Sequence, residues 1–106
     1  MDNADKEYNI EIAPVVNDRM AEHIEFLSRV SPNASDKLLL EMLKDIKSLK
    51  KMPERCPHYN RPYLPIGKYR FKSSANRYRI VFQIIGNCVF VDDIQDCRQS
   101  DIQNIV

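Results

Sequence analysis

The chain has 106 residues, of which 43% are hydrophobic and 29% charged, and its formal net charge is +1. These values are typical of a globular protein with one hydrophobic core. No apolar run reaches the roughly 18 to 20 residues that a membrane-spanning helix needs. The polar, acidic start of the chain is unlike a signal peptide. The sequence therefore predicts a single soluble domain, residues 1–106, in the cytoplasm.

The near-neutral net charge conceals an uneven distribution. Between Arg55 and Val91 there are seven Lys or Arg residues and no Asp or Glu, so this segment carries +7 and the remainder carries −6. A concentrated positive surface attracts phosphate groups or an acidic protein segment. The charge pattern therefore predicts an anionic partner rather than a particular fold.

The three cysteines, Cys56, Cys88 and Cys97, are odd in number and widely spaced. This pattern indicates neither a disulfide framework nor a paired zinc or redox motif. Cys56 lies close to His58, but no second pair of ligands occurs elsewhere in the sequence. We therefore expect no metal site and no cofactor.

The first half of the chain predicts a strand and a helical hairpin. After a flexible tail at residues 1–7, apolar residues alternate from Tyr8 to Ile12, which is typical of a strand with one buried face. Pro14 ends this strand, and the apolar spacing then becomes helical. The stripe of the first helix consists of Val16, Met20, Ile24 and Leu27.

A second helix is predicted to begin at Ser31-Pro32, because Ser can cap free amide groups and Pro tolerates the first helical position. Its expected apolar stripe is Leu39, Met42, Leu43, Ile46 and Leu49. The short break between the helices predicts an antiparallel pair. The lysines near the end of the second helix, Lys47, Lys50 and Lys51, fit either a solvated helix terminus or an extension of the positive surface.

Three strands are predicted in the second half. Four prolines between Met52 and Pro65 exclude regular structure there. The expected strands are Lys68–Ser73, Arg77–Ile85 and Cys88–Ile94, with turns at Asn76 and Gly86-Asn87 and a C-terminal tail at residues 99–106. One face of this sheet packed on the helix pair gives a two-layer α+β domain.

The first of these strands combines cations with aromatic residues. Side chains alternate between the two faces of a strand, so Lys68, Arg70 and Lys72 share one face while Tyr69 and Phe71 point to the other. We therefore predict a cationic outer face and an aromatic face that packs inward.

Three segments, IKSLKKMPE, LPIGKYRFKSSANRYRIVFQI and VFVDDIQDCRQ, together resemble the RelE/ParE superfamily of type II toxin–antitoxin toxins. The resemblance covers about Tyr8 to Gln99 and includes the order of elements. It implies one of two activities, since RelE-type members cleave mRNA on the ribosome and ParE-type members poison DNA gyrase. Of these we expect a metal-independent, ribosome-associated mRNA endonuclease, with the gyrase inhibitor as the alternative. The resemblance also implies a cognate antitoxin as partner.

For the nuclease alternative, the resemblance implies a catalytic set of Arg70, Lys72, Arg79 and Arg98, although Cys97 could take the register of Arg98. A metal-independent ribonuclease must stabilise a phosphorane-like transition state and assist proton transfer. Arg70 and Arg79 suit phosphate binding, and Lys72 suits charge stabilisation or proton transfer. The neighbouring residues Lys68, Tyr69, Arg77 and Tyr78 are predicted to contact RNA.

Other interpretations remain open. At strand spacing, Phe71 and Tyr78 fit a core position better than base stacking. RelE-type nucleases place a tyrosine shortly after the last strand, and none follows Arg98 here. This difference favours a ParE-like gyrase inhibitor or a degenerate toxin that binds only its antitoxin. Cations on an exposed strand can also be a solvated face that discourages aggregation.

Overall fold

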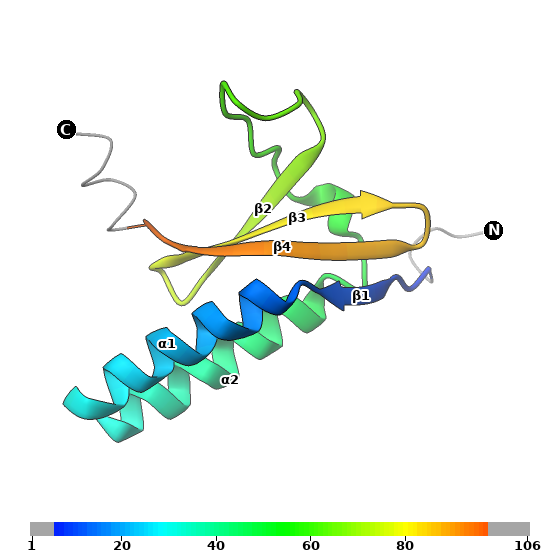
Figure 1. The fold of residues 1–106 in the computed structure, drawn as a ribbon. Helices are drawn as coiled ribbons and strands as arrows, with labels where there is room; N and C mark the ends of the chain where they lie inside the picture. Colours follow the sequence, from blue (N-terminus) through cyan, green and yellow to red (C-terminus); the bar gives the residue numbers. More distant parts are fainter. Residues whose placement is uncertain (1–5, 98–106) are drawn as a thin grey trace.

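The computed structural model describes residues 6–97, which form two α-helices, a short 3-10 helix and a four-stranded sheet (Figure 1). In chain order the elements are β1 (Asn9–Ile12), α1 (Pro14–Val30), α2 (Pro32–Ser48), η2 (Pro53–Arg55), β2 (Tyr69–Ser74), β3 (Tyr78–Ile85) and β4 (Cys88–Asp96). The sheet order is β1-β4-β3-β2, with β1 parallel to β4 and the other pairs antiparallel. The predicted two-layer α+β fold is confirmed. The expectation of no regular structure between Met52 and Pro65 is wrong at Pro53–Arg55, which forms η2, because Pro53 is tolerated at the start of a helix.

The helical hairpin begins and turns at the residues that the sequence indicated. Pro14 is the first residue of α1, and Pro32 is the first residue of α2. The hydroxyl of Ser31 accepts a hydrogen bond from the amide of Ala34 at 3.3 Å, which caps α2. None of the described helices is both long and apolar enough to cross a membrane.

Both helices cover one face of the sheet, which we call the helix-facing side (Figure 1). The core there joins Ile80, Phe82, Val89 and Val91 of the sheet to Val16 and Met20 of α1 and to Leu38, Met42, Ile46 and Leu49 of α2. The predicted stripe of α2 needs one correction, because Leu43 is 46% exposed. Leu38 occupies the buried row instead, since the buried face of α2 is rotated toward Ser35 and Leu38.

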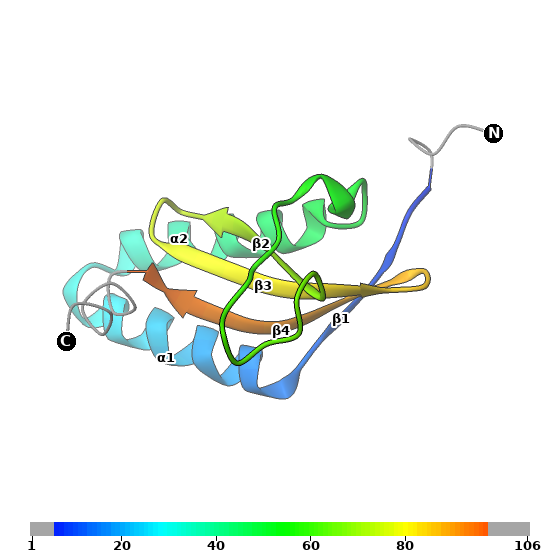
Figure 2. The same cartoon turned by 90° about the horizontal axis from the view of Figure 1, so that it is seen from above.

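The opposite face of the sheet is covered by the loop between η2 and β2, which crosses over the strands in Figure 2. We call this face the loop-covered side. Phe71 pairs with Val81 on this side, and Tyr59 of the loop contacts the Phe71 ring edge-on at 6.1 Å between centroids. Val81 and Tyr59 are each only 4% exposed. The loop therefore forms a second, smaller apolar layer.

This second layer corrects the predicted orientation of β2. Arg70 pairs with Phe82 and Lys72 with Ile80, so both cations lie on the helix-facing side, at the edge of the sheet. The aromatic residues of β2 pack under the loop rather than on the helices. The predicted alternation of side chains is therefore correct, but no local pattern indicated that a proline-rich loop would cover one face.

A β-bulge in β4 changes which residues face the core. Val81 pairs with Asp93 and Phe82 pairs with Val91, so Asp92 is an extra residue. Val91 and Ile94 can therefore both be buried, although they are three positions apart. Beside the bulge, Asp93 forms an ion pair with Arg19 of α1 at 2.6 Å.

Candidate functional site

The guanidinium group of Arg70 is hydrogen-bonded to backbone carbonyl groups of the same chain. Its Nη1 atom donates hydrogen bonds to the carbonyl oxygens of Cys56 at 2.6 Å and Glu54 at 3.0 Å. Two backbone bonds hold the next part of the loop to the same strand, from Phe71 N to Pro57 O and from Tyr59 N to Tyr69 O. Arg70 therefore fixes the start of the loop against β2.

Arg79 lies on the loop-covered side, in what we call the arginine–aromatic cluster: Tyr59, Arg61, Phe71, Arg79 and Gln95. The Arg79 guanidinium lies 5.2 Å from the centre of the Phe71 ring and 5.5 Å from that of Tyr59. Arg61 lies 4.3 Å from the Tyr59 ring centre. The Tyr59 hydroxyl donates to Gln95 Oε1 at 3.0 Å, and Arg79 makes only a long contact of 3.5 Å with the same oxygen.

This cluster holds two guanidinium groups next to aromatic faces. Such cation–π contacts orient arginine without using its hydrogen-bond donors. Arg61 and Arg79 are both partly exposed, whereas Tyr59 is buried and offers no free ring face for a base. At the nearby loop tip, Tyr63 is 76% exposed and Ile66 is 93% exposed. The arrangement is suited to contact with an anionic or mixed polar and apolar partner surface.

The side chains of Arg77 and Tyr78 both make contacts within the protein. Arg77 donates two hydrogen bonds to Asp96 Oδ2, at 2.8 and 3.2 Å, and the Asp96 side chain is 2% exposed. The hydrogen bond with Asp96 raises the pKa of the Arg77 guanidinium above its ordinary value. Tyr78 is 3% exposed and contacts the ring of His23. Tyr78 is thus a core residue, as its strand position favoured, and its ring is not available to a base in this structure.

The remaining predicted site residues are distributed around the edge of β2. Lys68 is exposed and lies 5.5 Å from the ring centre of the half-buried Tyr69. Lys72 is half-buried and lines a pocket beside the end of α2. Arg98 lies outside the described residues.

The structure brings Arg70 and Lys72 to one side of the sheet and places Arg79 on the other. Tyr59 and Arg61 were not among the predicted site residues. They lie in a loop whose sequence has no helical or strand periodicity. Their place in the arginine–aromatic cluster depends on the contact between this loop and the sheet. Within residues 6–97, no three His, Cys, Asp or Glu side chains come together as a metal site.

No protein-family model and no curated protein sequence matches the chain. Its fold is similar to a solved structure described as "Chromosomal ParDE TA system from P. aeruginosa". The TM-score is 0.70 and the identity 11%, and the match covers 86% of this chain and 97% of that one. At this identity the likeness concerns the fold alone, so the chain has the α+β fold of that ParDE structure.

Proposed function

We propose that this protein is the toxin of a type II toxin–antitoxin system. The observation that carries the proposal is the match over 86% of the chain to a structure described as a ParDE toxin–antitoxin system. The sequence segments that resemble the RelE/ParE superfamily support the same assignment independently, because that resemblance rests on residue patterns rather than on the fold. Together these observations favour a toxin over an unrelated protein with the same fold.

The helical hairpin supports an antitoxin as partner. Large apolar side chains are exposed on both helices, with Phe26 67%, Val30 75% and Leu40 68% exposed. The cationic segment from Arg55 to Val91 supplies the opposite charge for an acidic antitoxin. An amphipathic, acidic segment that folds on binding would bury the apolar side chains of the helices and neutralise the cationic segment.

The positions of the cations favour a toxin that acts by binding its target. Arg70 donates to backbone carbonyls, and Arg79 lies on the opposite side of the sheet from Lys72. A ribonuclease needs its cations to converge on one phosphate. For a binding toxin, the superfamily resemblance implies DNA gyrase as the target. A ribosome-dependent mRNA endonuclease is the second candidate, favoured by Lys72, which has no ion-pair partner among residues 6–97.

The first experiment expresses the protein in bacteria, with and without the product of the adjacent gene. We expect growth arrest that co-expression relieves, and a stable complex of the two proteins. Absence of both effects would refute the toxin assignment. Gyrase supercoiling and mapping of mRNA 5′ ends in a translating extract then separate the two activities.

The matched variants for these assays are Arg79→Ala and Arg29→Ala. Arg29 is an exposed arginine in the last turn of α1, paired with Glu25. We expect Arg79→Ala to lose toxicity and Arg29→Ala to retain it. Full toxicity of Arg79→Ala would exclude the arginine–aromatic cluster from target contact.

A further inference from the structure

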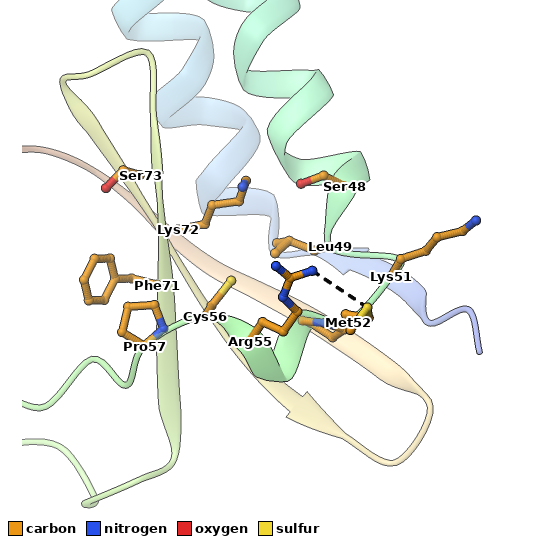
Figure 3. Close-up of a pocket in the computed structure, with 11 residues that line it drawn as sticks. Ser48, Leu49, Lys51, Met52, Arg55, Cys56, Pro57, Phe71, Lys72 and Ser73 are labelled. Atoms are coloured by element: carbon orange, nitrogen blue, oxygen red, sulfur yellow. Dashed lines mark hydrogen bonds between the residues drawn. The ribbon is translucent and has the colours of Figure 1, made fainter. Parts of the chain in front are cut away.

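A pocket of about 540 Å³ lies at the outer edge of β2, where this strand approaches the end of α2 and η2 (Figure 3). Its polar lining consists of Ser48, Lys51, Arg55, Cys56, Lys72 and Ser73. Leu49, which is 2% exposed, belongs to its apolar wall. None of the described residues that line the pocket is Asp or Glu. The pocket therefore combines a cationic side with an apolar side.

Two of the cations point into this space. Figure 3 shows Lys72 of β2 and Arg55 of η2 directed into the region beside Leu49, while Lys51 extends away from it. Among residues 6–97 none of the three forms an ion pair. Arg55 Nη1 contacts the Met52 sulfur at 3.9 Å, and a thioether sulfur is a weak acceptor.

Neighbouring protein groups do not supply the missing negative charge. The carboxylate of Glu54 accepts a hydrogen bond from the Tyr8 hydroxyl at 3.0 Å and does not line the pocket. Burial raises the pKa of the Cys56 thiol above its ordinary value, although the nearby cations Lys72 and Arg70 act to lower it. Cys56 is therefore neutral at pH 7. An anion from outside the chain would relieve the repulsion between the cations.

We propose that this pocket binds a phosphate monoester attached to a ring-bearing group, with Arg55 and Lys72 contacting the phosphate. A phosphate monoester carries a charge of about −1.5 to −2 at pH 7, which matches two cations. Arginine can donate two parallel hydrogen bonds to phosphate oxygens. The volume lies within the range of about 300 to 1,000 Å³ of small-molecule sites, so it accommodates more than a phosphate alone. Met52, which lines the pocket and is 37% exposed, would contact the attached ring.

A free nucleoside monophosphate and the 5′-phosphate end of a nucleic-acid strand share this chemistry. The proposal does not depend on the toxin assignment, because the pocket would bind either ligand in a protein of another function. Titration calorimetry with AMP, adenosine, and a short RNA with or without a 5′-phosphate distinguishes the sources. Tight binding of AMP identifies the free nucleotide, whereas binding of the phosphorylated RNA alone identifies the strand end.

The decisive comparison uses Arg55→Ala and Lys72→Ala, with Lys50→Ala as control. Lys50 is an exposed lysine next to Lys51 that does not line the pocket. We expect each of the first two changes to weaken binding by about tenfold or more, and the control to change it by less than about twofold. Removal of the phosphate from the ligand should weaken binding by a similar factor. Thermal unfolding verifies that each variant is folded.

Cys56 provides an independent readout. With AMP at about ten times its dissociation constant, alkylation of Cys56 by N-ethylmaleimide should slow about tenfold, because protection follows occupancy. Cys88, at the start of β4, should react at an unchanged rate and serves as the internal control. Absence of binding by every ligand, binding that ignores the phosphate, or equal effects of Lys50→Ala and Lys72→Ala would overturn the proposal.

Discussion

The two sides of the sheet are built differently. On the helix-facing side, Ile80 and Phe82 are completely buried by two long helices. On the loop-covered side, the buried Val81 lies beside Phe71, whose ring contacts Tyr59 of the loop. The neighbouring residues of β4 on this side are polar and include Asp93 and Gln95. The first side thus provides most of the apolar burial, whereas the second leaves polar groups accessible for recognition.

The same comparison separates cations that look equivalent in the sequence. Arg70 and Arg77 are hydrogen-bonded within the protein, to backbone carbonyls and to Asp96 respectively. Arg79 is held mainly by aromatic rings, and Lys72 faces a pocket. Removal of these side chains should therefore affect stability in the first two cases and binding in the others.

The largest expected effect contrasts the two sides directly. Phe82→Ala should reduce the free energy of unfolding by about 3 to 5 kcal/mol, because a large side chain is removed from a fully enclosed core. Val81→Ala should reduce the free energy of unfolding by about 2 kcal/mol, because valine is smaller than phenylalanine and the loop covers it with a thinner apolar layer. Urea denaturation measures both. An equal or larger loss for Val81→Ala would show that the loop layer is as important as the helix core.

The second effect concerns the ion pair between Arg77, just before β3, and Asp96, at the end of β4. Arg77→Gln should cost about 2 to 4 kcal/mol, because it removes two charge-assisted hydrogen bonds to a carboxylate that is 2% exposed. The Arg77 side chain is 33% exposed, which limits the cost relative to a fully buried pair. The control is Arg29→Gln, whose exposed pair with Glu25 should cost less than about 0.5 kcal/mol. Similar losses for the two variants would contradict this explanation.

Local patterns predicted the elements of the fold well. The Ser31-Pro32 cap, the period-two strands and the turn at Gly86 depend on neighbouring residues, and each was identified within a few positions. The β4 bulge was not predicted, because it depends on pairing with β3. The parallel pairing of β1 with β4 likewise requires contacts across most of the chain.

The candidate site was predicted less completely, for the same reason. The sequence left Tyr78 open between a core residue and an RNA contact, and the structure buries it. Arg79 was predicted as a phosphate-binding cation, and its partly exposed position leaves that prediction to be tested. Sequence reasoning could not place Tyr59 over β3, since the position of a proline-rich loop is decided by tertiary contacts. Nor could it separate Arg70 from Lys72. The carbonyl groups that bind Arg70 lie 14 and 16 residues away in the sequence, whereas Lys72 forms no ion pair among residues 6–97.

The third effect is local rather than global. Arg70→Ala should cost about 1 to 2 kcal/mol, because its two hydrogen bonds go to partly exposed carbonyl groups. The amides of Tyr59 and Phe71, which bond across the loop and β2, should exchange with solvent faster than in the unmodified protein. Amides within β4 should keep their protection. Uniform loss of protection across the sheet would contradict a role confined to the loop.

The smallest stability effect belongs to Arg79. Arg79→Ala should cost only about 0.5 to 1 kcal/mol, because partly exposed cation–π contacts are weak and the long contact to Gln95 adds little. Thermal unfolding measures the cost, and Arg79→Lys provides a variant that keeps the charge. A toxicity loss in Arg79→Ala without unfolding would then report target contact, since the fold does not depend on this side chain. A stability loss as large as that of Phe82→Ala would instead show that the arginine–aromatic cluster is a structural core.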